Sequence, residues 1–156
     1  SDIVAMSNKP IMVDPKGLEF EKYRGVNLIT PNRHEAELAT KFPQGGSPLE
    51  MAKIISEVTK AEHVLVTLGE DGVLYYSNGS SNTIPSVTSE VYDVTGAGDS
   101  LISTLALSYP ASGGDIEKSV LLGNYAAGVA VRKIGTTTVT VEQLKQIVES
   151  DNIIGV

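Results

Sequence analysis

The segment Asp93-Val94-Thr95-Gly96-Ala97-Gly98-Asp99-Ser100 joins an extended stretch to a small apolar helix predicted over residues 99–108. Because the glycines carry no side chains, backbone N–H groups can converge on an anion at the positive end of that helix. An acid in the same turn can accept a proton from a hydroxyl that attacks phosphorus. An ordinary helix start with Asp99 near the cap explains the spacing about equally well.

Outward from this turn, short apolar segments alternate with amphipathic ones along the chain. Runs that are apolar on both faces indicate buried strands, and apolar spacings of three and four residues indicate helices. His63–Leu68 is almost continuously apolar, so we predict a central parallel strand there. The alternation predicts an α/β layered fold in a single domain of 156 residues, without an internal boundary.

The other predicted elements follow from turn and capping signals. Asn78-Gly79 predicts a hairpin turn, and both Ser47–Glu50 and Thr140–Gln143 have the pattern of a capping box. Residues 1–8 are too short to form an element with a core of its own. The remaining predicted strands span 11–14, 26–30 and 73–77, with an extended stretch over 83–91. The remaining predicted helices span 32–40, 48–60, 115–132 and 140–150.

The composition excludes several classes of function. The chain has 12 Lys and Arg against 19 Asp and Glu, so its net charge of −7 argues against a broadly basic nucleic-acid surface. Without cysteine there are no disulfides, thiolate zinc sites or cysteine nucleophiles, and two histidines, His34 and His63, argue against a multi-histidine metal site. With neither a signal peptide nor an apolar run of about 20 residues, we expect a cytoplasmic protein without a membrane partner.

Two common nucleotide motifs are missing from the sequence. There is no G-x-x-x-x-G-K-[ST] segment, so the chain is not a Walker-type NTPase, and the dinucleotide-binding glycine pattern is also absent. Instead, Val94–Asp99 resembles the C-terminal signature of ribokinase-like (PfkB-type) carbohydrate kinases. Three further segments are similar to that family in the same order. They are Asn32-Arg33-His34-Glu35, like its Asn-x-x-Glu motif, Thr67–Gly72, like its nucleotide-binding strand and turn, and Asn124–Gly128, like its small-residue helix near the adenine.

Within the family, the sequence is most similar to the heptose 7-phosphate kinase module of lipopolysaccharide-precursor enzymes. The segments that carry this similarity are Val13–Gly17, Phe20–Gly25, Glu90–Asp99 and Gly135–Val139. The resemblance extends from about Pro10 to Val148. It implies an α/β ribokinase-like three-layer sandwich truncated at its N-terminal side. Residues 1–156 would be the C-terminal nucleotide-binding portion, without counterparts of the N-terminal sugar-binding half, its lid or a fused nucleotidyltransferase domain.

The resemblance assigns the central chemistry to the glycine-rich turn. Asp99 would be the general base that takes the sugar hydroxyl proton. Gly96, Ala97 and Gly98 would supply the anion hole for the phosphoryl group in transfer. The structural alternative for Asp99 is a helix cap.

The Asn-x-x-Glu motif would lie beside Mg²⁺ and the ATP phosphates. Asn32 and Glu35 would contact the metal largely through water, because Mg²⁺ keeps much of its hydration shell. The same two residues also fit an N-cap with a first-turn glutamate, and both roles can hold at once. Arg33 and His34 fall within this nucleotide-binding motif but depart from its apolar and small residues. We expect His34 to be a partly exposed helix residue.

Other positions have a nucleotide-binding role and a structural alternative side by side. Thr67, Gly69 and Gly72 would line the triphosphate and ribose, or form a plain strand–turn–strand. Lys16 would reach a phosphate, or be an exposed turn lysine. Asn124 would border the adenine, or be a buried polar residue satisfied by the backbone.

The implied reaction is ATP-dependent phosphorylation of the anomeric hydroxyl of D-glycero-D-manno-heptose 7-phosphate, giving the 1,7-bisphosphate for ADP-heptose synthesis. ATP, Mg²⁺ and a sugar phosphate are the implied ligands, and relatives leave open a monovalent cation near Gly135–Thr138. One alternative keeps the kinase chemistry with ribose, fructose, a fructose phosphate or a nucleoside as acceptor. The other is a nucleotide-binding fragment without turnover. Exposed strand edges would also allow a homodimer.

Overall fold

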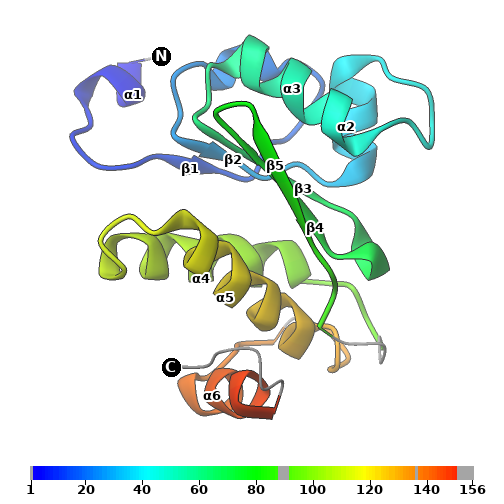
Figure 1. Ribbon diagram of the computed structural model, residues 1–156, viewed down its shortest axis with the longest axis vertical. Coiled ribbons are helices and arrows are strands. Elements are labelled where there is room, and N and C mark those ends of the chain that lie inside the picture. The colour runs from blue at the N-terminus through cyan, green and yellow to red at the C-terminus, as the bar shows by residue number, and fades with distance from the viewer. Residues whose placement is uncertain (1, 88–91, 136, 151–156) are drawn as a thin grey trace. The chain divides into compact units, whose positions relative to one another are not determined.

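A computed structural model of the chain describes residues 2–87, 92–135 and 137–150 (Figure 1). The chain groups into two compact units, residues 1–84 and residues 85–156. Each unit has its own buried apolar residues and is described separately.

The first unit is built on a five-stranded sheet with strand order β1-β2-β3-β4-β5. The strands are β1 (Met12–Val13), β2 (Leu28–Ile29), β3 (His63–Thr67), β4 (Val73–Ser77) and β5 (Ser80–Ile84). β1, β2 and β3 run parallel, with Met12 opposite Leu28 and Ile29 opposite Val64. β4 and β5 run antiparallel to their neighbours. The predicted central strand is therefore parallel on one side only, because the turn after Thr67 is too short for a parallel crossover.

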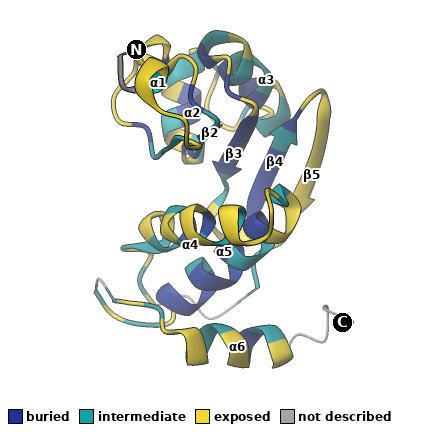
Figure 2. Ribbon diagram, turned by 90° about the vertical axis from the view of Figure 1, so that its left-hand side faces the viewer, coloured by how far each residue is buried: buried dark blue, intermediate teal, exposed yellow. Residues whose placement is uncertain are grey.

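Helices cover one face of this sheet (Figure 1). α2 (Arg33–Thr40) and α3 (Pro48–Thr59) bring Ala36, Met51 and Ile55 against the strands, where they pack with Ile29, Val64, Val66 and Leu74. Figure 2 shows β3 and β4 as buried strands. Burial of β3 on both faces agrees with its almost continuously apolar sequence.

Shorter elements complete the first unit. Residues 1–8 contain a five-residue helix, α1 (Asp2–Met6), and its Val4 packs against the core of the first unit. The single-turn helices η1 (Phe20–Tyr23) and η2 (Gly69–Asp71) follow β1 and β3. Ser47 caps α3 by accepting from the Glu50 N–H at 3.4 Å. The Glu50 carboxylate pairs with Lys53 at 2.8 Å, so the reciprocal half of the predicted capping box is replaced by an ion pair.

The described residues of the second unit form three helices: α4 (Ala97–Ala111), α5 (Ile116–Ala130) and α6 (Val141–Ser150). α4 and α5 pack closely at Gly123, where an added Cβ would lie 3.1 Å from the Leu101 carbonyl oxygen. Tyr125, Val129 and Ile147 form the buried cluster between α5 and α6. Within the parts of the chain that the structure covers, no helix is long and apolar enough to cross a membrane.

The helix starts in this unit follow local capping chemistry. Asp115 caps α5 by accepting from the Lys118 N–H at 3.1 Å. Thr140 and Gln143 form the predicted capping box before α6, with bonds of 3.0 and 3.2 Å. α4 begins two residues earlier than predicted because Gly96, with φ of 82°, takes the cap position. Part of the predicted extended stretch, residues 88–91, lies outside the described residues.

Candidate functional site

Polar residues follow the parallel strands of the first unit at their carboxyl ends. Asp14 follows β1, and Asn32 lies shortly after β2 and starts α2. Thr67 ends β3 and pairs with Asn32 in a parallel backbone bridge. Carboxyl ends of parallel strands share one edge of a sheet, which is where open α/β sheets bind ligands. The Asn32–Glu35 motif and the Thr67–Gly72 turn, widely separated in the sequence, therefore lie side by side.

Asn32 and Glu35 form a complete capping box at the start of α2. The Asn32 Oδ1 accepts from the Glu35 N–H at 2.8 Å, and the Glu35 Oε2 accepts from the Asn32 N–H at 2.9 Å. The structural alternative that we considered for this motif is therefore present. The capping box uses only one carboxylate oxygen of Glu35, and the other oxygen pairs with Lys16. The capping role therefore does not exclude a role of this motif in ligand binding.

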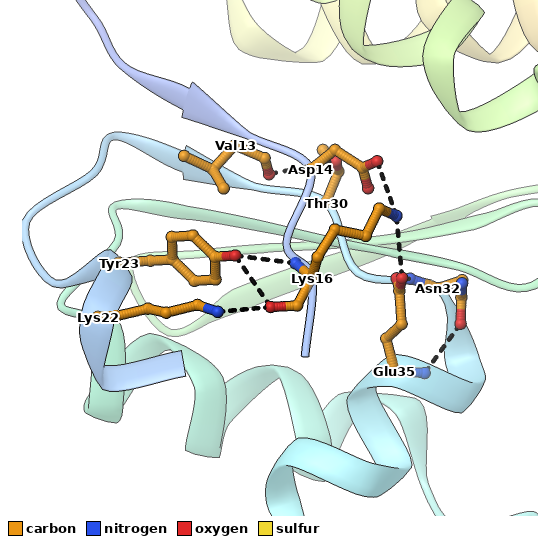
Figure 3. Close-up of polar contacts among 8 residues, drawn as sticks. All are labelled: Val13, Asp14, Lys16, Lys22, Tyr23, Thr30, Asn32 and Glu35. Carbon is orange, nitrogen blue, oxygen red and sulfur yellow. Dashed lines mark hydrogen bonds and ion pairs between the residues drawn. The ribbon is translucent and has the colours of Figure 1, made fainter. Parts of the chain in front are cut away.

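The Lys16 ammonium lies between two carboxylates, as Figure 3 shows. Its Nζ is 3.0 Å from Asp14 Oδ2 and 3.1 Å from Glu35 Oε1. The hydrogen bonds that Lys16 donates, to Asp14 first and then to Glu35, raise the pKa of Lys16 above its ordinary value. The side chain is 70% exposed, so solvent screens both pairs and they contribute little to stability. The structure thus joins Lys16 to the Asn32–Glu35 motif, and it adds Asp14, which our sequence analysis did not select.

The turn at the end of β3 has a conformation that favours glycine. Gly69 has φ of 64° and Gly72 has φ of 90°, and the Leu68 N–H donates to the Gly72 carbonyl at 2.8 Å. A Cβ added at Gly69 would meet no atom within 4 Å, so this backbone is open to a ligand, whereas Gly72 is buried. The arrangement is a strand–turn–strand, and the nucleotide role of Thr67, Gly69 and Gly72 stays a prediction.

The two departures from the family motif lie on the surface of α2. His34 is exposed, as expected. The Arg33 guanidinium is 3.8 Å from Asp71 Oδ2, which connects the start of α2 to η2. Arg33 therefore lies next to the glycine turn. Among the described contacts, none joins His34 to Asp14, Lys16 or Glu35.

In the second unit, Asp99 occupies the first turn of α4. Gly96 is the cap residue and makes no side-chain capping bond, so Asp99 is not the helix cap. The N–H groups of Gly98 and Asp99 lie in that first turn, where helix geometry provides no carbonyl partner. A Cβ added at Gly98 would meet no atom within 4 Å, and Asp99 is exposed. This end of α4 therefore offers backbone donors and a carboxylate to solvent.

Asp93 ties this turn to a second loop, a feature that our sequence analysis missed. Its Oδ1 accepts from the Thr95 N–H at 2.9 Å and its Oδ2 accepts from the Gly135 N–H at 2.9 Å. Hydrogen bonds from Thr95 and then Gly135 lower the pKa of Asp93. The position of Asp93 directly before the glycine motif was the available signal, because aspartates there commonly accept from the backbone two residues on.

Two further predicted positions have structural environments that do not decide their roles. Asn124 is 5% exposed and its Nδ2 donates to the Pro85 carbonyl at 2.7 Å, which is the backbone-satisfied alternative. The segment 135–138, considered for a monovalent cation, includes Thr136, which lies outside the described residues. An adenine contact of Asn124 and a cation near this segment stay predictions.

Comparisons with known proteins show what the chain is similar to. Residues 2–143 match the profile described as pfkB family carbohydrate kinase. The chain is 45% identical over 136 residues to "Bifunctional protein HldE" of Trichlorobacter lovleyi, which covers 85% of this chain and 28% of that protein. The protein of the same name in Aeromonas salmonicida is 45% identical over 86% of this chain and 29% of its own length. The chain thus spans less than a third of these relatives.

Solved structures confirm the predicted ribokinase-like α/β fold class. Ribokinase from Thermotoga maritima superposes with a TM-score of 0.84 at 24% identity, covering 95% of this chain and 52% of its own. Escherichia coli phosphofructokinase-2, solved in complex with potassium, gives a TM-score of 0.78 at 22% identity over 90% and 47% of the two chains. The chain corresponds to about half of each of these folds.

Proposed function

Because the chain belongs to the pfkB family of carbohydrate kinases, we propose that it is the nucleotide-binding portion of an ATP-dependent sugar kinase. The proposed reaction transfers the γ-phosphoryl group of ATP to the anomeric hydroxyl of D-glycero-D-manno-heptose 7-phosphate in the cytoplasm. The observation that carries the proposal is the start of α4, where an exposed Asp99 follows the glycine turn Gly96–Gly98. The heptose acceptor rests on the subgroup segments quoted above and on the 45% identity to the named relatives.

Phosphoryl transfer asks the protein for positioning and charge stabilisation rather than covalent chemistry. Asp99 would accept the proton of the attacking hydroxyl while the hydroxyl oxygen bonds to the γ-phosphorus. The bond from that phosphorus to the bridging oxygen of ATP would break, and ADP would leave. The anion hole of Gly96, Ala97 and Gly98, together with the positive end of α4, would stabilise the charge that builds on the transferring group. In the first unit, Lys16, Asn32 and the open Gly69 backbone would bind the phosphate chain.

The donor set of the first unit fits Mg²⁺ only as an ion that enters with the nucleotide. Within the described residues, no group of three or more His, Asp or Glu side chains could hold a metal ion. Glu35 offers a carboxylate that is 18% exposed beside Asp14, and a hydrated Mg²⁺ on ATP phosphates needs one or two such groups. Mg²⁺ would supply charge neutralisation on the phosphates.

Product analysis tests the proposed acceptor. The full-length natural protein is incubated with Mg-ATP and, separately, heptose 7-phosphate, ribose, fructose, fructose 6-phosphate and a nucleoside, and phosphorus NMR records the products. We expect ADP and a new anomeric phosphate with the heptose alone. Turnover with another acceptor instead would show that the heptose assignment is wrong and that the protein is still a kinase. Mg-ATP binding without turnover of any of these acceptors would overturn the kinase assignment and favour a nucleotide-binding module.

A further inference from the structure

The backbone of Lys16 is held on both sides by the single-turn helix η1. The Tyr23 hydroxyl accepts from the Lys16 N–H at 2.9 Å and donates to the Lys16 carbonyl at 3.1 Å. Lys22 donates to the same carbonyl at 2.7 Å, and its Nζ lies 5.0 Å from the centroid of the Tyr23 ring. Figure 3 shows these bonds converging on the loop after β1. Tyr23 therefore fixes the peptide groups on either side of one exposed residue.

Tyr23 packs against the core of the first unit, whereas the residue that its hydroxyl holds lies at the surface. Lys16 and Gly17 are exposed, and Gly17 has φ of 85°, which favours glycine. An exposed lysine on a four-carbon stem loses side-chain entropy when it is held in one place, and exposed ion pairs seldom repay that loss. Even so, the ammonium is placed 3.1 Å from Glu35 at the carboxyl ends of the parallel strands.

We propose that Tyr23 is a positioning residue that fixes the Lys16 backbone, so that the ammonium beside Glu35 binds the phosphate chain of the nucleotide. An ammonium has three N–H donors, and Asp14 and Glu35 accept two of them. The third is available to a phosphate oxygen. The proposal rests on the proposed function and adds to it a residue that touches no ligand itself.

The net negative charge of Asp14, Lys16 and Glu35 means that the nucleotide should bind here together with a divalent cation. Asp14 and Glu35 carry two negative charges against one on Lys16, so a free triphosphate is repelled by the cluster. A divalent cation carried by the nucleotide removes that repulsion. We therefore expect the contribution of Lys16 and Tyr23 to appear with Mg-ATP and to be small with AMP, which has a single phosphate.

A double-mutant cycle on the full-length natural protein tests the inference. Calorimetry measures the affinities of Mg-ATP and AMP for wild type, Tyr23→Phe, Lys16→Gln and the double variant. Lys16→Gln should weaken Mg-ATP by about tenfold. Tyr23→Phe keeps the ring and should weaken Mg-ATP by about fivefold, through one lost hydroxyl, with AMP unchanged. In the Lys16→Gln background, Tyr23→Phe should have no further effect.

Matched controls separate positioning from folding. Tyr76→Phe removes a hydroxyl from β4, and Lys53→Gln breaks the comparable exposed pair with Glu50; both should leave the Mg-ATP affinity unchanged. If Tyr23→Phe weakened the binding of Mg-ATP and of AMP equally, or if the two substitutions had additive effects, the inference would be overturned. The proposed kinase function would not be affected by either result. Failure of the wild-type protein to bind Mg-ATP would instead overturn the proposed function, and this inference with it.

Discussion

The Asp93 carboxylate accepts a hydrogen bond at 2.9 Å from the backbone N–H of Gly135, 42 residues further along the chain. Its other oxygen holds the Thr95 N–H, so one side chain joins the loop after α5 to the turn before α4. Aspartate suits this position because an ionised carboxylate accepts from two backbone donors at once. The glycine turn is thereby fixed by a group outside the motif itself.

Asp93→Asn should therefore make stability less dependent on pH. Hydrogen bonding lowers the pKa of Asp93 below its ordinary value of 3.8, so its stabilisation is present above that value. It is lost as the pH falls through the lower pKa of the folded state. Thermal unfolding between about pH 7 and pH 3 should show Tm falling more steeply below about pH 4 in wild type than in Asp93→Asn. An identical acid dependence in both proteins would exclude this role, and the exposed Asp71→Asn serves as control.

The two histidines form a matched pair for a second pH experiment. His63 is 5% exposed on β3, with Nδ1 3.0 Å from the Ser77 hydroxyl and 3.2 Å from the Tyr75 hydroxyl. Burial lowers the pKa of His63, although nearby Glu62 opposes this shift. Below the ordinary pKa of 6.5, His63 binds a proton in the unfolded chain but stays neutral in the folded one. The free energy of unfolding therefore decreases as the pH is lowered.

His63→Gln should remove that dependence between about pH 7 and pH 5.5. The slope that it removes is at most about 1.4 kcal/mol per pH unit, the value for one proton. Denaturant titrations at several pH values give the free energy of unfolding for each variant. His34→Gln, at the exposed position on α2, should keep the wild-type slope. A slope that is unchanged in His63→Gln would show that another group titrates.

Asn32 allows its capping role to be separated from its proposed ligand role. Asn32→Ala should cost about 1 kcal/mol of stability through the lost N-cap, and Asn32→Ser should cost less because serine also caps helices. If Asn32 also lies at the nucleotide, both variants should weaken Mg-ATP binding. Ser47→Ala removes the comparable cap from α3 and should lower stability alone. Normal Mg-ATP affinity in both Asn32 variants would leave only the structural role.

Gly98 and Gly123 should respond oppositely to the same substitution. Gly98→Ala adds a methyl group that meets no protein atom within 4 Å, so stability should hold or rise slightly, by about 0.5 kcal/mol. The methyl group would intrude where an anion is proposed to bind, and kcat should fall. Gly123→Ala places Cβ 3.1 Å from the Leu101 carbonyl oxygen and should lower Tm. Full activity in Gly98→Ala would argue against an anion site at this turn.

Local signals predicted most helix starts but not the contacts that assemble the site. The Asn32–Glu35 and Thr140–Gln143 boxes are complete within four residues, so the sequence was enough to predict them. The predicted start of α4 was two residues too late, because Gly96 occupies the cap position with a positive φ angle and has no capping side chain. The bonds of Tyr23 to Lys16 and of Asp93 to Gly135 depend on how loops fold back, which no periodicity shows.

Strand pairing shows the same limit. The apolar run of β3 correctly predicted a buried, central strand, yet burial on both faces does not distinguish a parallel from an antiparallel neighbour. The short Gly69–Gly72 connection decides that β4 returns antiparallel.

The most direct test of the account is single-turnover phosphoryl transfer by the full-length natural protein and its Asp99→Asn variant. If Asp99 is the general base, the variant should transfer phosphate about 10² to 10⁴ times more slowly, while its Mg-ATP affinity stays within about twofold. Glu117→Gln, in the first turn of α5, is the matched control and should behave as wild type. Transfer by Asp99→Asn within about tenfold of the wild-type rate would contradict the assignment of Asp99 as base.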